Sequence, residues 1–583
     1  MYTINRVPLA NDWNTRRPDG YDIVVIGSGY GGAVTAARLA TAQWPNPKPT
    51  ICILERGKEW LPGQFPDRLD KALAENRSSL QPLGLYDFRF GPDIGVIAGS
   101  GLGGTSLVNA NAVIQPDREV FDNPQWPEPI RTDRDSGRLQ QLFDRVRATL
   151  FAARHPDGMS LGKVKALKAG ADGDPNAEFD LHHIAVNFQF EGPNHWGVNQ
   201  RRCINCGDCT SGCNVGAKNT LDTNYLAIAK GGGAEIFTQV EVKRIEKQPG
   251  GGYKLHYLRR ESTHGAAEAG VIVAKRIAVV AAGALGSTEI MLRSRASGLS
   301  LPDTVGTRFS GNGDFFGVAY NSNLRTNTLG WGAYPDSERS RRMQPGPGPT
   351  LNPGPTIVSK VRYNRNQPLA RRVKIEDLSV PLMYVDTVRA IMAFSIGRDT
   401  DPQDASDNFK EFVRRMRDLG GISPDLEKGA MNYTLVYLVN GHDDAGGRME
   451  LNSLTDEVSI KWPGVGGQAV FQLENQILNA HATKLGSTFV ENPLWGFTPF
   501  KTLVTAHPLG GCPMGETHQT GLVNHQGQVY DQNGNLHPGL YVADAAAIPT
   551  SMGVNPFLTI SALAERRGEH LVQELGGQPV VVP

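Results

Sequence analysis

A glycine-rich turn between two apolar strands constrains the fold of this 583-residue chain more than any other feature. Residues Tyr21–Ile26 form a short β-branched run that is typical of a buried parallel strand. The motif Gly27-x-Gly29-x-x-Gly32 follows, then an alanine-rich helical stretch over 33–42 and a second strand over 50–54 that ends at Glu55. Such glycines let a pyrophosphate approach the backbone at a helix N-terminus, and the acid is placed to accept hydrogen bonds from ribose hydroxyls. We therefore expect a dinucleotide-binding fold, although this motif alone does not separate FAD from NAD.

A second glycine cluster favours FAD. Gly99, Gly103 and Gly104 belong to a segment that ends at Asn109, and so many glycines indicate a backbone that lies flat against an extended ligand. The alternative is a tight surface turn. Residues 271–282 and 539–544 read as further strands, the second of which ends at Asp544.

These pieces predict an α/β chain with a discontinuous FAD-binding Rossmann-like domain. We expect its N-terminal, middle and C-terminal parts at 15–125, 216–310 and 501–583. An inserted segment, 126–215, carries a cysteine loop. Alternating stretches such as 433–439 and 458–462 predict a second, substrate-binding domain over 311–500, built on an antiparallel sheet and helices.

The charge balance and the lack of long apolar runs exclude several classes of partner. Lys plus Arg and Asp plus Glu are both 59, so no basic excess points to nucleic acid. No apolar run is long enough to span a bilayer, and the N-terminus shows no signal-peptide pattern. Four of the six cysteines are clustered, which fits a reducing compartment. We expect a cytoplasmic enzyme, with a periplasmic or secreted location left open.

The clustered cysteines have the spacing of iron–sulfur ligands. Cys203, Cys206, Cys209 and Cys213 are arranged C-x2-C-x2-C-x3-C. In two-cluster ferredoxins the fourth cysteine of such a run serves the other cluster, so four ligands to one cluster do not follow. Structural zinc, disulfides and free thiols are the alternatives.

Five sequence blocks, in order, identify a family. They are GSGYGGAVTAARL, GLGGTSLVNA, AGALGSTEIMLRS, AHPLGGCPMG and GVNPFLTISALAERR, and they extend from about residue 21 to 572. Together they resemble the glucose–methanol–choline (GMC) flavoprotein family, most closely its bacterial cholesterol-oxidase-like branch. The resemblance implies FAD, oxidation of an alcohol to a carbonyl, and hydride transfer to the flavin.

The same resemblance assigns site residues. His507 and Asn555 match the catalytic pair that faces the substrate oxygen. A histidine near its ordinary pKa can accept the alcohol proton, and an asparagine amide can hold the developing oxyanion. A structurally satisfied imidazole is the alternative for His507. The resemblance places Gly104, Asn109, Pro556 and Phe557 near the isoalloxazine ring, Asp544 near the ribityl or pyrophosphate portion and Val242 near the adenine.

Two departures bear on the function. Cholesterol oxidases carry a glutamate base for steroid isomerisation, and the stretch 441–448, which we align with it, contains Asp443 and Asp444 but no glutamate. One of these aspartates could substitute as the base, but an acidic hairpin turn is the favoured interpretation, so sterol isomerisation is not expected. Cholesterol oxidases also lack the cysteine loop, whereas some cluster-bearing sugar dehydrogenases of the superfamily use C-x5-C-x3-C, which Cys203, Cys209 and Cys213 match.

We therefore expect an FAD-dependent alcohol dehydrogenase whose electrons leave through a cluster to an acceptor protein or quinone. The alternative is an oxidase, sterol-like in type, that reduces oxygen to hydrogen peroxide and has a structural cysteine loop. A non-redox use of the flavin is a third possibility, against which the retention of both His507 and Asn555 argues. The identity of the alcohol is not readable, because Trp331, Tyr384 and Trp495 fit a pocket wall and core packing equally well.

Overall fold

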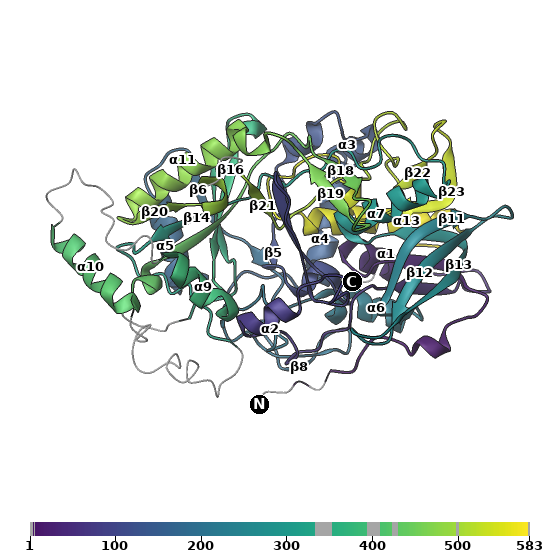
Figure 1. The fold of residues 1–583 in the computed structure, drawn as a ribbon, viewed down its shortest axis with the longest axis horizontal. Coiled ribbons are helices and arrows are strands. Elements are labelled where there is room, and N and C mark those ends of the chain that lie inside the picture. Colours follow the sequence, from purple (N-terminus) through teal and green to yellow (C-terminus); the bar gives the residue numbers. More distant parts are fainter. Residues whose placement is uncertain are drawn as a thin grey trace.

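Strands from the beginning, middle and end of the chain meet in one eight-stranded sheet (Figure 1). In this computed structural model the described residues are 4, 6–332, 352–392, 408–422, 429–496 and 501–580. β1 (Tyr21–Ile26) pairs in parallel with β2 (Ile51–Leu54) and with β13 (Ala267–Val280). β10 (Glu235–Phe237) continues the parallel array beyond β2, and β23 (Leu536–Val542) continues it beyond β13.

The rest of this sheet is antiparallel. β11 (Val240–Lys247) and β12 (Tyr253–Arg260) form a hairpin that pairs through β12 with the first half of β13. β22 (Gln528–Tyr530) pairs with β23 at the other side. The predicted α/β class is confirmed, and the strands of this sheet come from three separate pieces of sequence.

Helices cover this sheet and bury its central strands. Ile23, Val24 and Val25 of β1 have no exposed surface, as expected for a strand covered on both faces. α1 (Tyr30–Thr41) packs against α6 (Tyr225–Gly231) and α13 (Phe557–Glu574). Arg38 of α1 and Glu565 of α13 form a buried ion pair of 2.5 Å, and the Tyr225 hydroxyl donates to the same carboxylate at 2.8 Å.

A second, six-stranded sheet is wholly antiparallel and has the order β20-β14-β17-β16-β15-β6. The helices α5 (Gly162–Ala171) and α11 (Ala469–Lys484) pack against it. The strands are β6 (Ala177–Leu181), β14 (Phe315–Tyr320), β15 (Ser359–Tyr363), β16 (Val373–Leu378), β17 (Leu435–Asn440) and β20 (Thr488–Glu491).

The structure differs from the sequence-based domain boundaries at two points. β6 and α5 lie within 126–215, which we expected to be a separate insert, yet both belong to the six-stranded sheet and its cover. The predicted strand at 458–462 is β19 (Val458–Lys461), which pairs with β18 (Arg448–Leu451) in a hairpin outside that sheet. Alternation of apolar residues predicts a strand but not the sheet to which it belongs.

The other elements lie outside these two sheets. The remaining strands are β3 (Tyr86–Arg89), β4 (Ile94–Gly99), β5 (Ala112–Val113), β7 (His183–Ile184), β8 (Gly192–Pro193), β9 (Asn199–Gln200) and β21 (Leu503–Thr505). The remaining helices are α2 (Leu69–Ala74), α3 (Glu128–Asp135), α4 (Arg138–Thr149), α7 (Gly283–Ala296), α9 (Leu382–Met392), α10 (Asn408–Ile422) and α12 (Pro493–Gly496).

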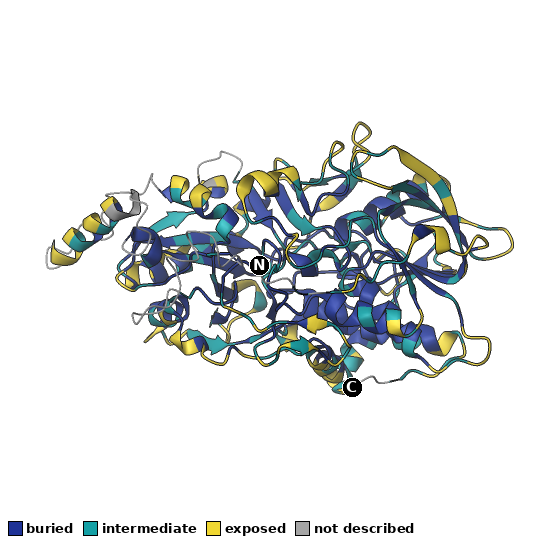
Figure 2. Cartoon of the chain, turned by 90° about the horizontal axis from the view of Figure 1, so that it is seen from below, coloured by how far each residue is buried: buried dark blue, intermediate teal, exposed yellow. Residues whose placement is uncertain are grey.

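Burial is concentrated around the two sheets, and α10 is largely exposed at one end of the molecule (Figure 2). Across the described ranges, none of the helices combines the length and apolar character needed to cross a bilayer.

Candidate functional site

A cavity of about 670 Å³ runs between the two sheets. At one end it is lined by Ile26, Leu54 and Val242 of the parallel sheet and its hairpin, and at the other by Phe316 and Leu438 of the six-stranded sheet. Of the three aromatic residues predicted to fit either a pocket or a core, Tyr384 lines this cavity. Trp495 packs in the apolar core against the six-stranded sheet, and Trp331 packs against the cysteine loop.

The glycines of the first motif bring the backbone to the cavity. Gly27 has φ +98°, and a Cβ there would lie 2.3 Å from the Ala281 carbonyl oxygen. A Cβ on Gly32 would lie 2.1 Å from the Gly27 carbonyl oxygen, so this glycine permits close helix–strand packing and does not itself line the cavity. Gly29 lines the cavity directly before α1, with open space where a side chain would be. The N-terminus of α1 is thus open to an anionic ligand.

Glu55 lies where the sequence predicts, at the cavity wall beyond β2. Its carboxylate accepts from the Ser28 hydroxyl at 2.5 Å and from the Gly57 amide at 2.8 Å. A carboxylate has further lone pairs, so a role toward ribose hydroxyls remains a prediction.

The second glycine segment lies against the first. A Cβ on Gly104 would lie 2.9 Å from Cα of Gly29, so the two loops approach at a point where only glycine fits. Gly99, Gly104 and Asn109 line the cavity, whereas Gly103 is buried behind it in a left-handed conformation. The Asn109 amide donates to the Tyr30 hydroxyl at 2.7 Å.

The C-terminal residues complete the wall. Asp544, Pro556 and Phe557 line the cavity, and the Phe557 ring stacks on Tyr30 with a centroid distance of 4.7 Å. Asp544 accepts from the Ser287 hydroxyl and the Gly283 amide, which fixes the start of α7.

The residues present fit FAD. The cavity follows glycine backbone from the first motif to the second and ends at polar side chains, as an extended dinucleotide requires. In the described part of the chain, the buried Asn109 Oδ1 has no hydrogen-bond partner, so it is available to a ligand atom.

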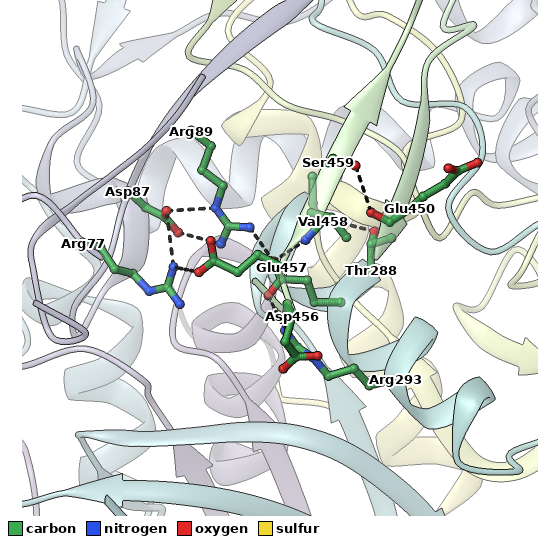
Figure 3. Close-up of polar contacts among 12 residues, drawn as sticks. Arg77, Asp87, Arg89, Thr288, Arg293, Glu450, Asp456, Glu457, Val458 and Ser459 are labelled. Carbon is green, nitrogen blue, oxygen red and sulfur yellow. Dashed lines mark hydrogen bonds and ion pairs between the residues drawn. The ribbon is translucent and has the colours of Figure 1, made fainter. Parts of the chain in front are cut away.

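A charge network surrounds Asp87, which lines the cavity together with Arg56 (Figure 3). The buried Asp87 carboxylate of β3 lies 3.0 Å from Arg89, 3.1 Å from Arg56 and 3.6 Å from Arg77. Arg77 also pairs with Glu457 at 2.7 Å, next to β19. The network thereby ties the β18–β19 hairpin to β3 across the cavity wall.

His507 and Asn555 meet at the other end of the cavity. Both line it, and Asn555 Nδ2 lies 3.3 Å from His507 Nε2. His507 follows β21 and Asn555 precedes α13, so the two residues are 48 positions apart in sequence.

Asp314, which the sequence did not single out, orients the imidazole. Its Oδ1 lies 2.8 Å from His507 Nδ1, and its Oδ2 accepts from the Thr505 hydroxyl at 2.9 Å. Because a carboxylate only accepts, Nδ1 carries the proton and Nε2 is left to accept one at the cavity. Burial alone would lower the pKa of His507, but the charge of Asp314 outweighs it and raises that pKa above its ordinary value.

Glu376 of β16 is a second residue that the sequence analysis missed, and it places a glutamate beside Asn555 from outside the stretch 441–448. Asn555 Nδ2 donates to its Oε2 at 3.3 Å, while among the described residues its buried Oε1 has no partner. Burial raises the pKa of Glu376 to about 7. Asp443, in the stretch 441–448, instead accepts from the Ser310 hydroxyl and the Gly313 amide and supports the loop.

The four cysteines of the loop line one pocket. Thr210, between Cys209 and Ser211, lines the large cavity, and the Lys218 ammonium joins the Cys209 carbonyl to the Asn109 carbonyl. The loop is thus a neighbour of the flavin site.

A metal site at this loop is not shown. No group of three or more His, Cys, Asp or Glu side chains within the described ranges is arranged to hold a metal ion. All four cysteines are free, and Cys203, Cys206 and Cys213 pack with Val215, Ala217 and Trp331. Burial raises the pKa of the Cys206 and Cys209 thiols, so they pack here as small neutral hydrophobes. The predicted ligand set is therefore not supported by this arrangement.

The sequence is similar to known flavin-dependent oxidoreductases. Models of the GMC oxidoreductase family match residues 21–310 and 475–564. The chain is 27% identical to a cholesterol oxidase of Mycobacterium tuberculosis, over 94% of this chain and 90% of that protein. It is 25% identical to a cholesterol oxidase of Acinetobacter baumannii, over 94% and 93%. It is also 25% identical to a long-chain-alcohol oxidase of Arabidopsis thaliana, over 93% of this chain and 66% of that protein.

Solved structures share the fold at low identity. A fungal aryl-alcohol oxidase aligns with a TM-score of 0.55 at 14% identity, covering 96% of this chain and all of that one. An FAD-dependent oxidoreductase from Chaetomium thermophilum aligns with a TM-score of 0.56 at 15% identity, covering 95% and 99%.

Proposed function

The chain belongs to the GMC oxidoreductase family, and from that premise we propose that it oxidises an apolar alcohol to a carbonyl with dioxygen as the acceptor. That it is an FAD-dependent alcohol oxidoreductase follows from the family and its relatives. In the proposed reaction the alcohol loses two hydrogen atoms and dioxygen gains both, giving one carbonyl and one hydrogen peroxide.

The choice of dioxygen is supported by the relatives. The proteins reported above that match over nearly all of this chain are oxidases, both the cholesterol oxidases and the long-chain-alcohol oxidase. Cholesterol and long-chain alcohols are apolar, and the cavity here is lined by apolar side chains such as Phe316, Val388 and Leu438. An apolar wall favours a sterol or a long-chain alcohol over a sugar.

His507, Asn555 and Asp314 would have different roles in the oxidation of the alcohol. The alcohol hydroxyl would donate to His507 Nε2, which takes its proton as the C–H bond breaks. The Asn555 amide would donate to the same oxygen and stabilise its developing negative charge. Asp314 holds the imidazole in the required tautomer. When bound, FAD supplies the acceptor for the hydride.

The observation that carries the proposal is the convergence of His507 and Asn555 on the cavity wall. To test it, sterols, long-chain alcohols and sugars are screened with an artificial electron acceptor. We expect His507→Ala to lose at least about 100-fold in kcat for the best alcohol while retaining the flavin absorption. Full activity of both His507→Ala and Asn555→Ala would refute the assignment.

Glu376 supports a finer proposal for sterol substrates. Its carboxyl shares the Asn555 amide with His507, so a base lies beside the position where the new carbonyl forms. On a sterol, Glu376 would take a proton from the carbon next to that carbonyl and return it further along, moving the double bond into conjugation. Ultraviolet absorption of a conjugated enone product tests this step.

A second candidate function uses the cysteine loop as an electron exit. It is favoured by one observation, namely that the pocket lined by the four thiols adjoins the flavin cavity at Thr210. The test is iron and acid-labile sulfide in protein purified without oxygen. If the cluster exists, Cys206→Ser removes its absorption while Cys512→Ser, a buried cysteine elsewhere, does not. Absence of sulfide excludes this route.

A further inference from the structure

Helix α10 is amphipathic with its apolar side turned outward. Phe409, Phe412, Met416 and Leu419 follow one another at intervals of three or four residues, so they share one face. Their exposed fractions are 78%, 59%, 52% and 63%. We call these four residues the apolar stripe. Figure 1 shows α10 at the left-hand end of the molecule, opposite the end formed by β11–β13.

The charged side of α10 fixes this orientation. Asp418 is buried and accepts from the Tyr320 hydroxyl at 2.7 Å and from the Asn321 amide at 3.0 Å. The buried Arg414 donates to the Thr488 hydroxyl at 3.3 Å. Turning the stripe inward would break these contacts of Asp418 and Arg414. Burying a charged side chain without its partners is destabilising. The fold therefore holds the apolar side toward solvent.

Two further contacts strengthen this anchoring. Arg417 donates to the Ser322 carbonyl at 2.8 Å, and its guanidinium lies 3.6 Å from the centre of the Tyr433 ring. Thus α10 is attached through polar groups along its inner side, the reverse of an ordinary surface helix.

Charge indicates what covers the stripe. On the described side chains of α10, the exposed charged residues are Lys410 and Arg415, both cations. Arg415 is three residues from Phe412 and four from Leu419, so it borders the stripe. Apolar side chains with flanking cations match a surface that is apolar beneath and anionic at its rim, as an anionic lipid bilayer is.

The size of the stripe argues against a protein partner. At about 200 Å² or less for each large side chain, four partly exposed ones offer well below the roughly 800 Å² per partner that a stable protein interface buries. A bilayer needs no such matching area, because each inserted side chain contributes separately.

Helix α10 is linked through Tyr320 to a helix that lines the cavity. Tyr320, whose hydroxyl binds Asp418, packs in one apolar cluster with Val385 and Met392 of α9. The same helix lines the cavity with Tyr384, Thr387 and Val388. A surface docked on α10 would therefore be next to a wall of the cavity.

We propose that α10 is a docking surface for anionic lipid bilayers, with the apolar stripe inserted among the lipids and Lys410 and Arg415 at the headgroups. The docking stands independently of the reaction. Only its consequence, delivery of an apolar alcohol from the bilayer to the cavity, rests on the proposed function.

Co-sedimentation of the full chain with vesicles, without substrate, tests the docking. We expect binding to vesicles that contain phosphatidylglycerol and weaker binding to pure phosphatidylcholine. The Phe412→Ser/Met416→Ser variant should bind at least about tenfold more weakly. Lys410→Glu/Arg415→Glu should lose the preference for anionic lipid. Leu80→Ser/Leu454→Ser, at two strongly exposed leucines elsewhere, should bind like wild type.

Three results would overturn the proposal. They are wild-type protein that stays in the supernatant with anionic vesicles, a serine variant that binds as well as wild type, and a concentration-dependent dimer that the serine variant abolishes. Unchanged melting temperatures show that the variants fold. Oxidation of a short soluble alcohol at the wild-type rate separates a docking defect from a failure of the proposed chemistry.

Discussion

Asp314 orients the buried imidazole of His507 and raises its pKa, so that His507 can act as a base. Without its carboxylate, burial would favour a neutral His507 of either tautomer, and the Nε2 lone pair would not be fixed toward the cavity. We therefore expect Asp314→Asn to lower kcat/KM by on the order of tenfold to a hundredfold. Since the pKa of His507 would fall, the acidic limb of the pH–rate profile should move to lower pH.

The pH profile separates positioning from folding. Asp443→Asn is the matched control, because Asp443 is also a buried carboxylate with several donors but does not contact His507. It should leave the acidic limb in place. A limb that does not move in Asp314→Asn would contradict the role given to Asp314.

Glu376 predicts a second pH dependence. Burial raises its pKa to about 7, so its carboxylate form grows as the pH rises through about 7. Conversion of a sterol ketone to its conjugated isomer should rise over the same range, and Glu376→Gln should abolish it while alcohol oxidation continues. Glu474→Gln, at a buried carboxyl on α11, is the control. An isomerisation rate that does not change as the pH rises through about 7 would show that Glu376 is not the base in this step.

Strand β3 and the β18–β19 hairpin are held together by ion pairs, because Arg77 contacts both Asp87 of β3 and Glu457 next to β19. Burial alone would raise the pKa of Asp87, but Arg89, Arg56 and Arg77 outweigh it and hold that pKa well below its ordinary value. The stabilisation is therefore present above the unfolded pKa of about 4 and is lost as the pH falls toward the folded value.

Removing that anion should destabilise the hairpin. Asp87→Asn leaves three arginines around an uncharged amide, and we expect a loss of about 3 kcal/mol, seen as a lower melting temperature above pH 5 or so. Asp70→Asn, in the exposed Arg68–Asp70 pair, should not change melting. Equal melting of Asp87→Asn and wild type would show that the network contributes nothing.

The chain as a whole shows which parts of a site can be predicted from sequence. Gly27, Gly29, Glu55 and the pair His507 and Asn555 lie in local motifs, and the structure brings them to one cavity. Asp314 and Glu376 have no such signal. They reach the site because β14, β17 and β16 are neighbours in the six-stranded sheet, a long-range pairing in the least recognisable part of the sequence.

The cysteine loop illustrates the opposite case. The spacing of its cysteines predicts cluster ligands, but spacing does not determine how closely the sulfur atoms converge or what they bind, and the four thiols line one pocket without forming a metal site among the described residues. Nor did local pattern reveal that the apolar side of α10 faces outward, since that depends on Tyr320 and Asn321 holding its charged side.

Oxygen consumption during alcohol turnover tests the central claim most directly. With the best alcohol and no added acceptor, we predict that oxygen disappears and hydrogen peroxide forms one for one with the carbonyl product, and that His507→Ala abolishes all three. Turnover that requires an added acceptor and consumes no oxygen would contradict the claim that this protein is an oxidase.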